Sequence, residues 1–258
     1  MRLSQIGKMT LSAILLALAI LMTFLAKLIP MGSFSFLRFS LTPSIVIFCS
    51  LACGPIYGAI VGAASDMIPA FTFSTGQYNF LLTIVYALLG ILPWVLSKLF
   101  PLLKEGEQRK WPLYVVIGLI GVMYALVAVF FYATPYLNEA FGDAGVYLKP
   151  LILGLLALGV AVLIVGILLF GKRDQKVSWS NLVLIATISE ILLMLVGKSL
   201  AFWIFYSWIA DIRFGATYWY FFSMLLVGTP INILLIAGMN RLYFALGTRL
   251  LNGQGDHR

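Results

Sequence analysis

The chain has 258 residues, of which 62% are hydrophobic and only 10% are charged, and its mean hydropathy is +1.04. A soluble domain of this length needs far more charge on its surface, so the composition excludes the soluble classes of protein. The formal net charge of +8 is explained by basic loops on one side of a membrane better than by nucleic-acid binding. The single histidine, His257, lies in a polar tail, which leaves no histidine-ligated metal site and no histidine-based triad.

Apolar segments separated by polar loops predict an all-α integral membrane protein, folded over residues 1–258 as one compact bundle of about eight transmembrane helices. Helices are expected at about 9–28, in a hairpin within 37–69, and at about 79–100, 113–133, 149–170, 181–206 and 218–246.

The first helix, Met9–Leu28, is too long for a cleaved signal peptide and has no Ala-x-Ala cleavage site. It carries Ala13 and Ala17 four residues apart, and small residues at this spacing allow another helix to approach closely in lipid. Packing within the protein would explain the same pair.

The segment Leu37–Pro69 is predicted to form two short helices joined by a tight turn. Gly54-Pro55 interrupts its apolar run, because proline cannot continue a helical hydrogen-bond ladder and restricts the residue before it. The second half is dense in small residues, which suits close packing. Arg38 at the start and Asp66 near the end are then expected near the same membrane face.

Most of the 17 lysine and arginine residues fall in loops on one predicted side of the membrane. Because such loops stay in the cytoplasm, we expect a multi-pass protein of the cell membrane with both termini cytoplasmic. The turn at Gly54-Pro55 then faces the cytoplasm, while Arg38, Asp66 and the loop 70–78 face outside.

Three ionisable residues lie inside predicted helices: Asp66, Glu190 and Lys198. A charge in hydrocarbon is costly, so each is expected to face protein or water. Lys198 is predicted at the depth of Asp66, where the two form an ion pair or point together into an outward cavity. A purely stabilising pair is an equal alternative. Glu190 lies deeper on the same helix, where a backbone or hydroxyl partner is expected.

The outer ends of the helices gather side chains that suit a flat, polar aromatic ligand. They include Arg38, Gln77, Tyr78, Asn79, Trp203 and Tyr206. An interfacial belt explains the aromatic members, since tryptophan and tyrosine favour the membrane surface. It explains the arginine and the two amides less well, and arginine suits a carboxylate or phosphate through two parallel hydrogen bonds.

Several of these motifs resemble the substrate-binding S component of energy-coupling factor (ECF) vitamin transporters, and the folate branch in particular. The motifs are Arg38-Phe39-Ser40 followed by Pro43, Gly54-Pro55 followed by Gly58, Gly62 and Asp66, the pair Ala13 and Ala17, and the segment from Pro230-Ile231-Asn232 to Arg241.

The resemblance implies a protein that captures a vitamin outside the cell and is not an enzyme. It would work with a transmembrane T subunit and two ATPase subunits, which use ATP, while this chain binds no cofactor or metal. Ala13 and Ala17 would meet the T subunit. Arg38, with Asp66, Gln77, Tyr78, Asn79, Lys198, Trp203 and Tyr206, would surround the substrate.

The family has a six-helix core, which would correspond here to residues 9–100 and 180–247, with 113–170 as an inserted helix pair. Folate is the expected ligand, and riboflavin, a nucleobase derivative or an aromatic amino acid stays open. The alternative function is a stand-alone secondary transporter or channel, in which Asp66, Glu190 and Lys198 form a coupling relay.

Overall fold

The structure, a computed structural model of the chain, describes residues 4–28, 41–73, 78–100, 111–133, 145–171, 178–210 and 228–243. Nearly all of these residues are helical and none of them forms a strand, which confirms the predicted all-α fold. Arg38 and Gln77 lie outside the described residues.

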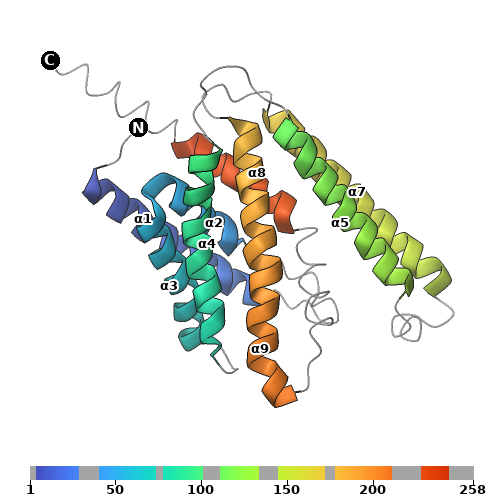
Figure 1. Cartoon of the computed structure of the whole chain (residues 1–258), viewed down its shortest axis with the longest axis horizontal. Helices are drawn as coiled ribbons and strands as arrows, with labels where there is room; N and C mark the ends of the chain where they lie inside the picture. Colours follow the sequence, from blue (N-terminus) through green and yellow to red (C-terminus); the bar gives the residue numbers. More distant parts are fainter. Residues whose placement is uncertain are drawn as a thin grey trace.

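The N-terminal part of the chain forms a compact group of four helices. They are α1 (Gln5–Leu28), α2 (Thr42–Cys53), α3 (Pro55–Phe73) and α4 (Phe80–Leu99). Each of the first three contacts the others, and α4 packs on α2 and α3 (Figure 1).

A separate pair follows, made of α5 (Trp111–Ala133) and α7 (Gly145–Gly171). Next comes one long helical rod, composed of α8 (Trp179–Glu190), the π-helix η3 (Ile191–Gly197) and α9 (Lys198–Ala210). The last described helix spans 228–243 and is the red, unlabelled helix of Figure 1.

The break between α2 and α3 lies where the sequence predicts it. Gly54 has a φ of 104°, a backbone conformation that side chains with a Cβ rarely adopt. Its N–H donates to the carbonyl oxygen of Ser50, and Pro55 begins the next helix. Proline suits a first helical position because its missing N–H has no partner to lose there.

The small residues of α3 bring its backbone against that of α4. A Cβ added to Gly58 would overlap the carbonyl oxygen of Gly90, and one added to Gly62 would overlap that of Tyr86. Gly58 also lies against Ser50 of α2. The predicted close packing is therefore present, and it joins three helices rather than only the two halves of the hairpin.

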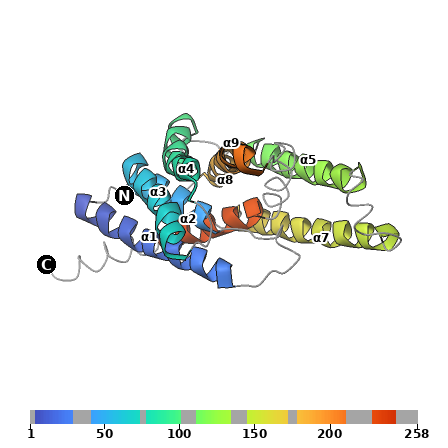
Figure 2. The ribbon, with the colours of Figure 1, turned by 90° about the horizontal axis from the view of Figure 1, so that it is seen from below.

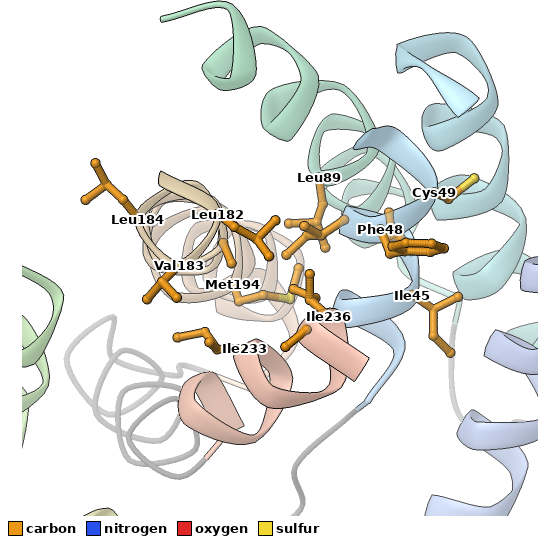
Figure 3. Close-up of a cluster of buried hydrophobic side chains, with 14 of the residues drawn as sticks. Ile45, Phe48, Cys49, Leu89, Leu182, Val183, Leu184, Met194, Ile233 and Ile236 are labelled. Atoms are coloured by element: carbon orange, nitrogen blue, oxygen red, sulfur yellow. The ribbon is translucent and has the colours of Figure 1, made fainter. Parts of the chain in front are cut away.

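Helix α2 lies at the centre of the bundle, with nearly all of its residues buried. The apolar core around it is made by side chains of α2, α4, α8 and the helix 228–243, as Figure 3 shows for Ile45, Phe48, Leu89, Leu182 and Ile236. Since these helices come from both ends of the chain, the core joins the two parts that the sequence analysis assigned to one domain.

Helices α5 and α7 extend to one side of this bundle (Figure 2). α5 contacts α8. α7 contacts the start of α8 through a hydrogen bond of 2.9 Å, which Trp179 Nε1 of α8 donates to the carbonyl oxygen of Ile167 in α7. The two helices are joined to each other by a 3.0 Å bond from the Tyr124 hydroxyl to the carbonyl oxygen of Leu153. Most of their remaining surface is apolar and exposed.

Within the described residues, four helical stretches are long and apolar enough to cross a membrane: Gln5–Leu25, Phe80–Leu99, Trp111–Val129 and Trp179–Ser207. The stretches Thr42–Cys53 and Leu156–Leu169 are apolar but shorter. These lengths agree with the predicted class of membrane protein. The expected total of about eight crossings, compared with these four candidate spans, stays a prediction.

Candidate functional site

Two groups of polar side chains lie inside this apolar bundle. The first, which we call the outer polar cluster, consists of Asp66, Tyr78, Thr83 and Lys198. Thr83 Oγ1 on α4 donates a hydrogen bond of 2.6 Å to Asp66 Oδ2 on α3. The Tyr78 hydroxyl lies 2.6 Å from Thr83 Oγ1. Because the single proton of Thr83 goes to the carboxylate, Tyr78 donates to Thr83, and the three side chains form one chain of hydrogen bonds.

Lys198, the first residue of α9, adds the positive charge of the outer polar cluster. Its ammonium lies near enough to the Asp66 carboxylate to attract it. It also lies over the ring of Tyr86, 5.8 Å from the ring centroid, a distance at which a cation interacts with a π-system. The structure thus brings together two side chains that the sequence placed at one depth, although α3 and α9 are far apart in the chain.

Asn79 has partners for both ends of its amide. Its oxygen accepts a 3.0 Å bond from the N–H of Leu81 and so caps α4, and its nitrogen donates 3.2 Å to the carbonyl oxygen of Ala201. The side chain is buried. This arrangement ties the start of α4 to α9 next to Lys198, which is a structural role that the sequence analysis did not assign to it.

The two predicted aromatic residues of α9 have different surroundings. Tyr206 packs on the ring of Phe202, with 4.4 Å between the ring centroids. Trp203 is 37% exposed. Neither has a described contact with Asp66. Arg38 and Gln77 are outside the described residues. Of the eight predicted substrate-binding residues, the structure therefore groups Asp66, Tyr78 and Lys198.

Ala13 and Ala17 lie on the exposed side of α1. Their neighbours on that side, Ile14 and Leu21, are exposed as well, while Leu15 and Ala19 on the opposite side are buried against the bundle. Packing inside the part of the chain that the structure describes therefore does not account for the pair, and this face of α1 is free to meet lipid or another protein.

The second group, the inner polar cluster, consists of Ser44, Glu190, Thr229 and Asn232. Glu190 ends α8 and is fully buried. Thr229 and Asn232 adjoin its carboxyl group from the helix 228–243. Neither completes a hydrogen bond of normal geometry to it, and both carboxyl oxygens lack a partner among the described residues. On the other side, the Ser44 hydroxyl of α2 donates to Asn232 Oδ1.

The sequence analysis predicted only Glu190 of this group. It expected a backbone or hydroxyl partner for that residue. The Thr229 hydroxyl adjoins the carboxyl group, but it does not form a hydrogen bond to it. The available signal was the pair Thr229 and Asn232, two polar residues three positions apart in an apolar run, which places them on one side of a helix.

The rod that carries Glu190 and Lys198 is also not a uniform α-helix. The seven residues between them form the π-helix η3, whereas we expected one regular helix over 181–206. π-Helical segments are rare and often accompany functional sites. Here the segment separates the two charged residues, one in each polar cluster.

No family model, curated protein or solved structure matches this chain. Within the described ranges, no group of three or more histidine, cysteine, aspartate or glutamate side chains is arranged to hold a metal ion. The assignment of function therefore depends on the two polar clusters, on the exposed face of α1 and on the motif resemblance.

Proposed function

We propose that this chain is the substrate-specificity subunit, or S component, of an ECF-type ABC importer. It captures a vitamin on the extracellular side of the cell membrane, with folate as the leading candidate, and crosses the membrane about eight times with both termini in the cytoplasm. A T subunit and two ATPase subunits drive uptake, because the sequence holds no nucleotide-binding motif of its own.

The observation that carries the proposal is the outer polar cluster. Its charged groups, Asp66 and Lys198, come from two helices and lie beside Tyr78 and Thr83 in a bundle that is largely apolar. Ionisable groups at such a place are costly and usually serve substrates or ions. A carboxylate suits the hydrogen-bond donors of a polar ring system, and an ammonium suits a carboxylate tail. Arg38, which the sequence analysis assigned to the same site, would suit that tail as well.

The exposed face of α1 supports the part of the proposal that concerns the T subunit. Ala13 and Ala17 lie on it without a role in internal packing, and small residues four apart allow a partner helix to come close. This face would meet the T subunit. Helices α5 and α7, which lie to one side of the bundle, would then be the pair added to the family's core.

The first test is mass spectrometry of the small molecules released from the full chain after purification in mild detergent. A stoichiometric vitamin supports the proposal and identifies the substrate. If repeated preparations from vitamin-rich medium release none, high-affinity capture is contradicted. In the same assay, Arg38→Ala is expected to weaken binding of the released compound while the chain stays folded.

The docking face is tested separately with Ala13→Trp. We expect vitamin binding to be unchanged and uptake to be lost in cells that also express the T and ATPase subunits, because a large side chain keeps the partner helix away. The matched control is Val122→Trp on α5, at a residue that is also exposed. It should keep both binding and uptake, and normal uptake by the Ala13 variant would contradict the assigned face.

A second candidate function is a stand-alone secondary transporter. It is favoured by the π-helix that separates Glu190 from Lys198, with Asp66 beside the latter, since a chain of ionisable groups can couple transport to an ion gradient. Uptake by the purified chain alone in liposomes, driven by a proton or sodium gradient, would establish it. Absence of such uptake, with bound vitamin present, favours the S component.

A further inference from the structure

We propose that the inner polar cluster is a binding site for a monovalent alkali-metal cation, with Glu190 as its anionic ligand. This site is separate from the outer polar cluster and does not depend on vitamin capture. It lies where the end of α8, the start of the helix 228–243 and the start of α2 meet.

The charge of Glu190 requires compensation. The residue is fully buried, and the groups that adjoin its carboxyl, Thr229 and Asn232, are neutral. Lys198 lies beyond the whole π-helix, where it interacts with Asp66 instead. An ionised carboxylate without a counter-charge is strongly unfavourable in a protein interior, so Glu190 either takes up a proton or binds a cation there.

The oxygen atoms around Glu190 are available as ligands for a cation. Both of its carboxyl oxygens and the hydroxyl oxygen of Thr229 lack hydrogen-bond partners among the described residues, although Thr229 adjoins the carboxyl. Three buried oxygens that lack hydrogen-bond partners can therefore all serve a cation.

The charge count selects a monovalent ion. Glu190 is the one acidic side chain of the cluster, and no group of three potential metal ligands of the histidine, cysteine or acidic type exists in the described ranges. One carboxylate neutralises one monovalent cation, whereas a divalent ion would leave an uncompensated positive charge in the core. An all-oxygen site also suits a hard ion rather than a soft one.

The surrounding structure holds these oxygens in place. The Ser44 hydroxyl binds Asn232 Oδ1 and fixes that amide between α2 and the helix 228–243. The backbone changes from α-helix to π-helix directly after Glu190, as is common at binding sites. A bound cation would therefore connect three elements of the core and stabilise the folded bundle.

The test is the melting temperature of the purified full chain, in detergent and without added vitamin, in sodium, potassium or choline chloride at equal ionic strength. We expect sodium or potassium, but not choline, to raise it by about 3–5 °C for each tenfold increase in concentration above the dissociation constant. Equal melting temperatures in the three salts would overturn the site. So would a stability that follows only pH, since a proton would then be the ligand.

Variants assign the response to Glu190. Glu190→Gln keeps the shape and removes the charge, so the difference between sodium and choline should disappear. Asp66→Asn changes the other acidic residue that is described inside a predicted membrane helix. This variant should keep the difference in melting temperature between sodium and choline. Thr229→Val should shift the half-maximal cation concentration upward about tenfold or more, since loss of even a group that supports a ligand costs about that much in metal affinity. A full response in Glu190→Gln, or an unchanged midpoint in Thr229→Val if the former does not fold, would overturn the proposal.

Discussion

Helices α3 and α4 on one side, and α5 and α7 on the other, both contain several glycines but use them differently. A Cβ on Gly58, Gly62 or Gly90 would overlap the backbone of the facing helix. A Cβ on Gly121 or Gly159 would meet nothing within 4 Å. The first pair is held by direct contact of two backbones, whereas the second presents an apolar surface to its surroundings. The same residue type therefore marks a fixed contact in one region and open surface in the other.

This difference matters for the outer polar cluster. Asp66 follows Gly62 by one helical turn on α3, and Thr83 precedes Tyr86, the residue that Gly62 touches, on α4. The close glycine contact sets the distance between the two helices. It thereby sets the distance over which Thr83 reaches Asp66. Function in this chain is expected to depend on α3 and α4 far more than on α5 and α7.

The largest effect is expected from Gly62→Ala. The added methyl group overlaps the carbonyl oxygen of Tyr86, so α3 and α4 must separate, and overpacking of this kind costs about 1–3 kcal/mol or more. Thermal unfolding followed by tryptophan fluorescence measures it. A variant as stable as the parent chain would show that the contact is looser than described.

Next is Lys198→Met, which removes the positive charge of the outer polar cluster and keeps an unbranched side chain. If the ammonium binds a carboxylate of the substrate, affinity should fall about 10- to 100-fold, the range for loss of a charged hydrogen bond. Equilibrium binding of the identified vitamin measures it. Lys98→Met, at an exposed lysine over the ring of Trp94 near the other end of α4, is the control and should bind normally.

A smaller effect is expected from Thr83→Val. It removes the hydroxyl that connects Tyr78 to Asp66 without changing the volume much. The free energy of unfolding should fall by about 1–2 kcal/mol, because a half-buried carboxylate loses its donor. Thr72→Val is the matched control, since its hydroxyl bonds only to its own helix at an exposed position. Equal melting temperatures for the two variants would contradict the hydrogen-bonded chain.

The smallest effect, and of opposite sign, is expected from Gly121→Ala on α5. The new methyl group meets nothing within 4 Å, and alanine is up to about 1 kcal/mol better than glycine inside a helix. The melting temperature should rise slightly, and vitamin binding should not change. A loss of stability would mean that this face of α5 is covered by a part of the protein.

Several features could be predicted from the sequence because they depend on neighbours in the chain. The end of α2 at Gly54-Pro55 is one, since a proline and a glycine in the left-handed region act on the local backbone. The proximity of Asp66 and Lys198 is another, because helix length and a fixed rise per residue set how far along its helix each residue lies. The partners Thr83 and Tyr86 were not predicted, since their contacts join α4 to α3 and α9.

The sequence by itself determined that the chain is helical, with segments long and apolar enough to span a membrane, where those segments lie and where the hairpin turns. Only the tertiary structure decided which face of each helix is used: Ala13 and Ala17 face outward, Gly58 and Gly62 face a helix, and Glu190 is enclosed by the helix 228–243. The physical reason is the solvent. In lipid, the outer and inner faces of a helix are equally apolar, so no hydrophobic period in the sequence distinguishes them.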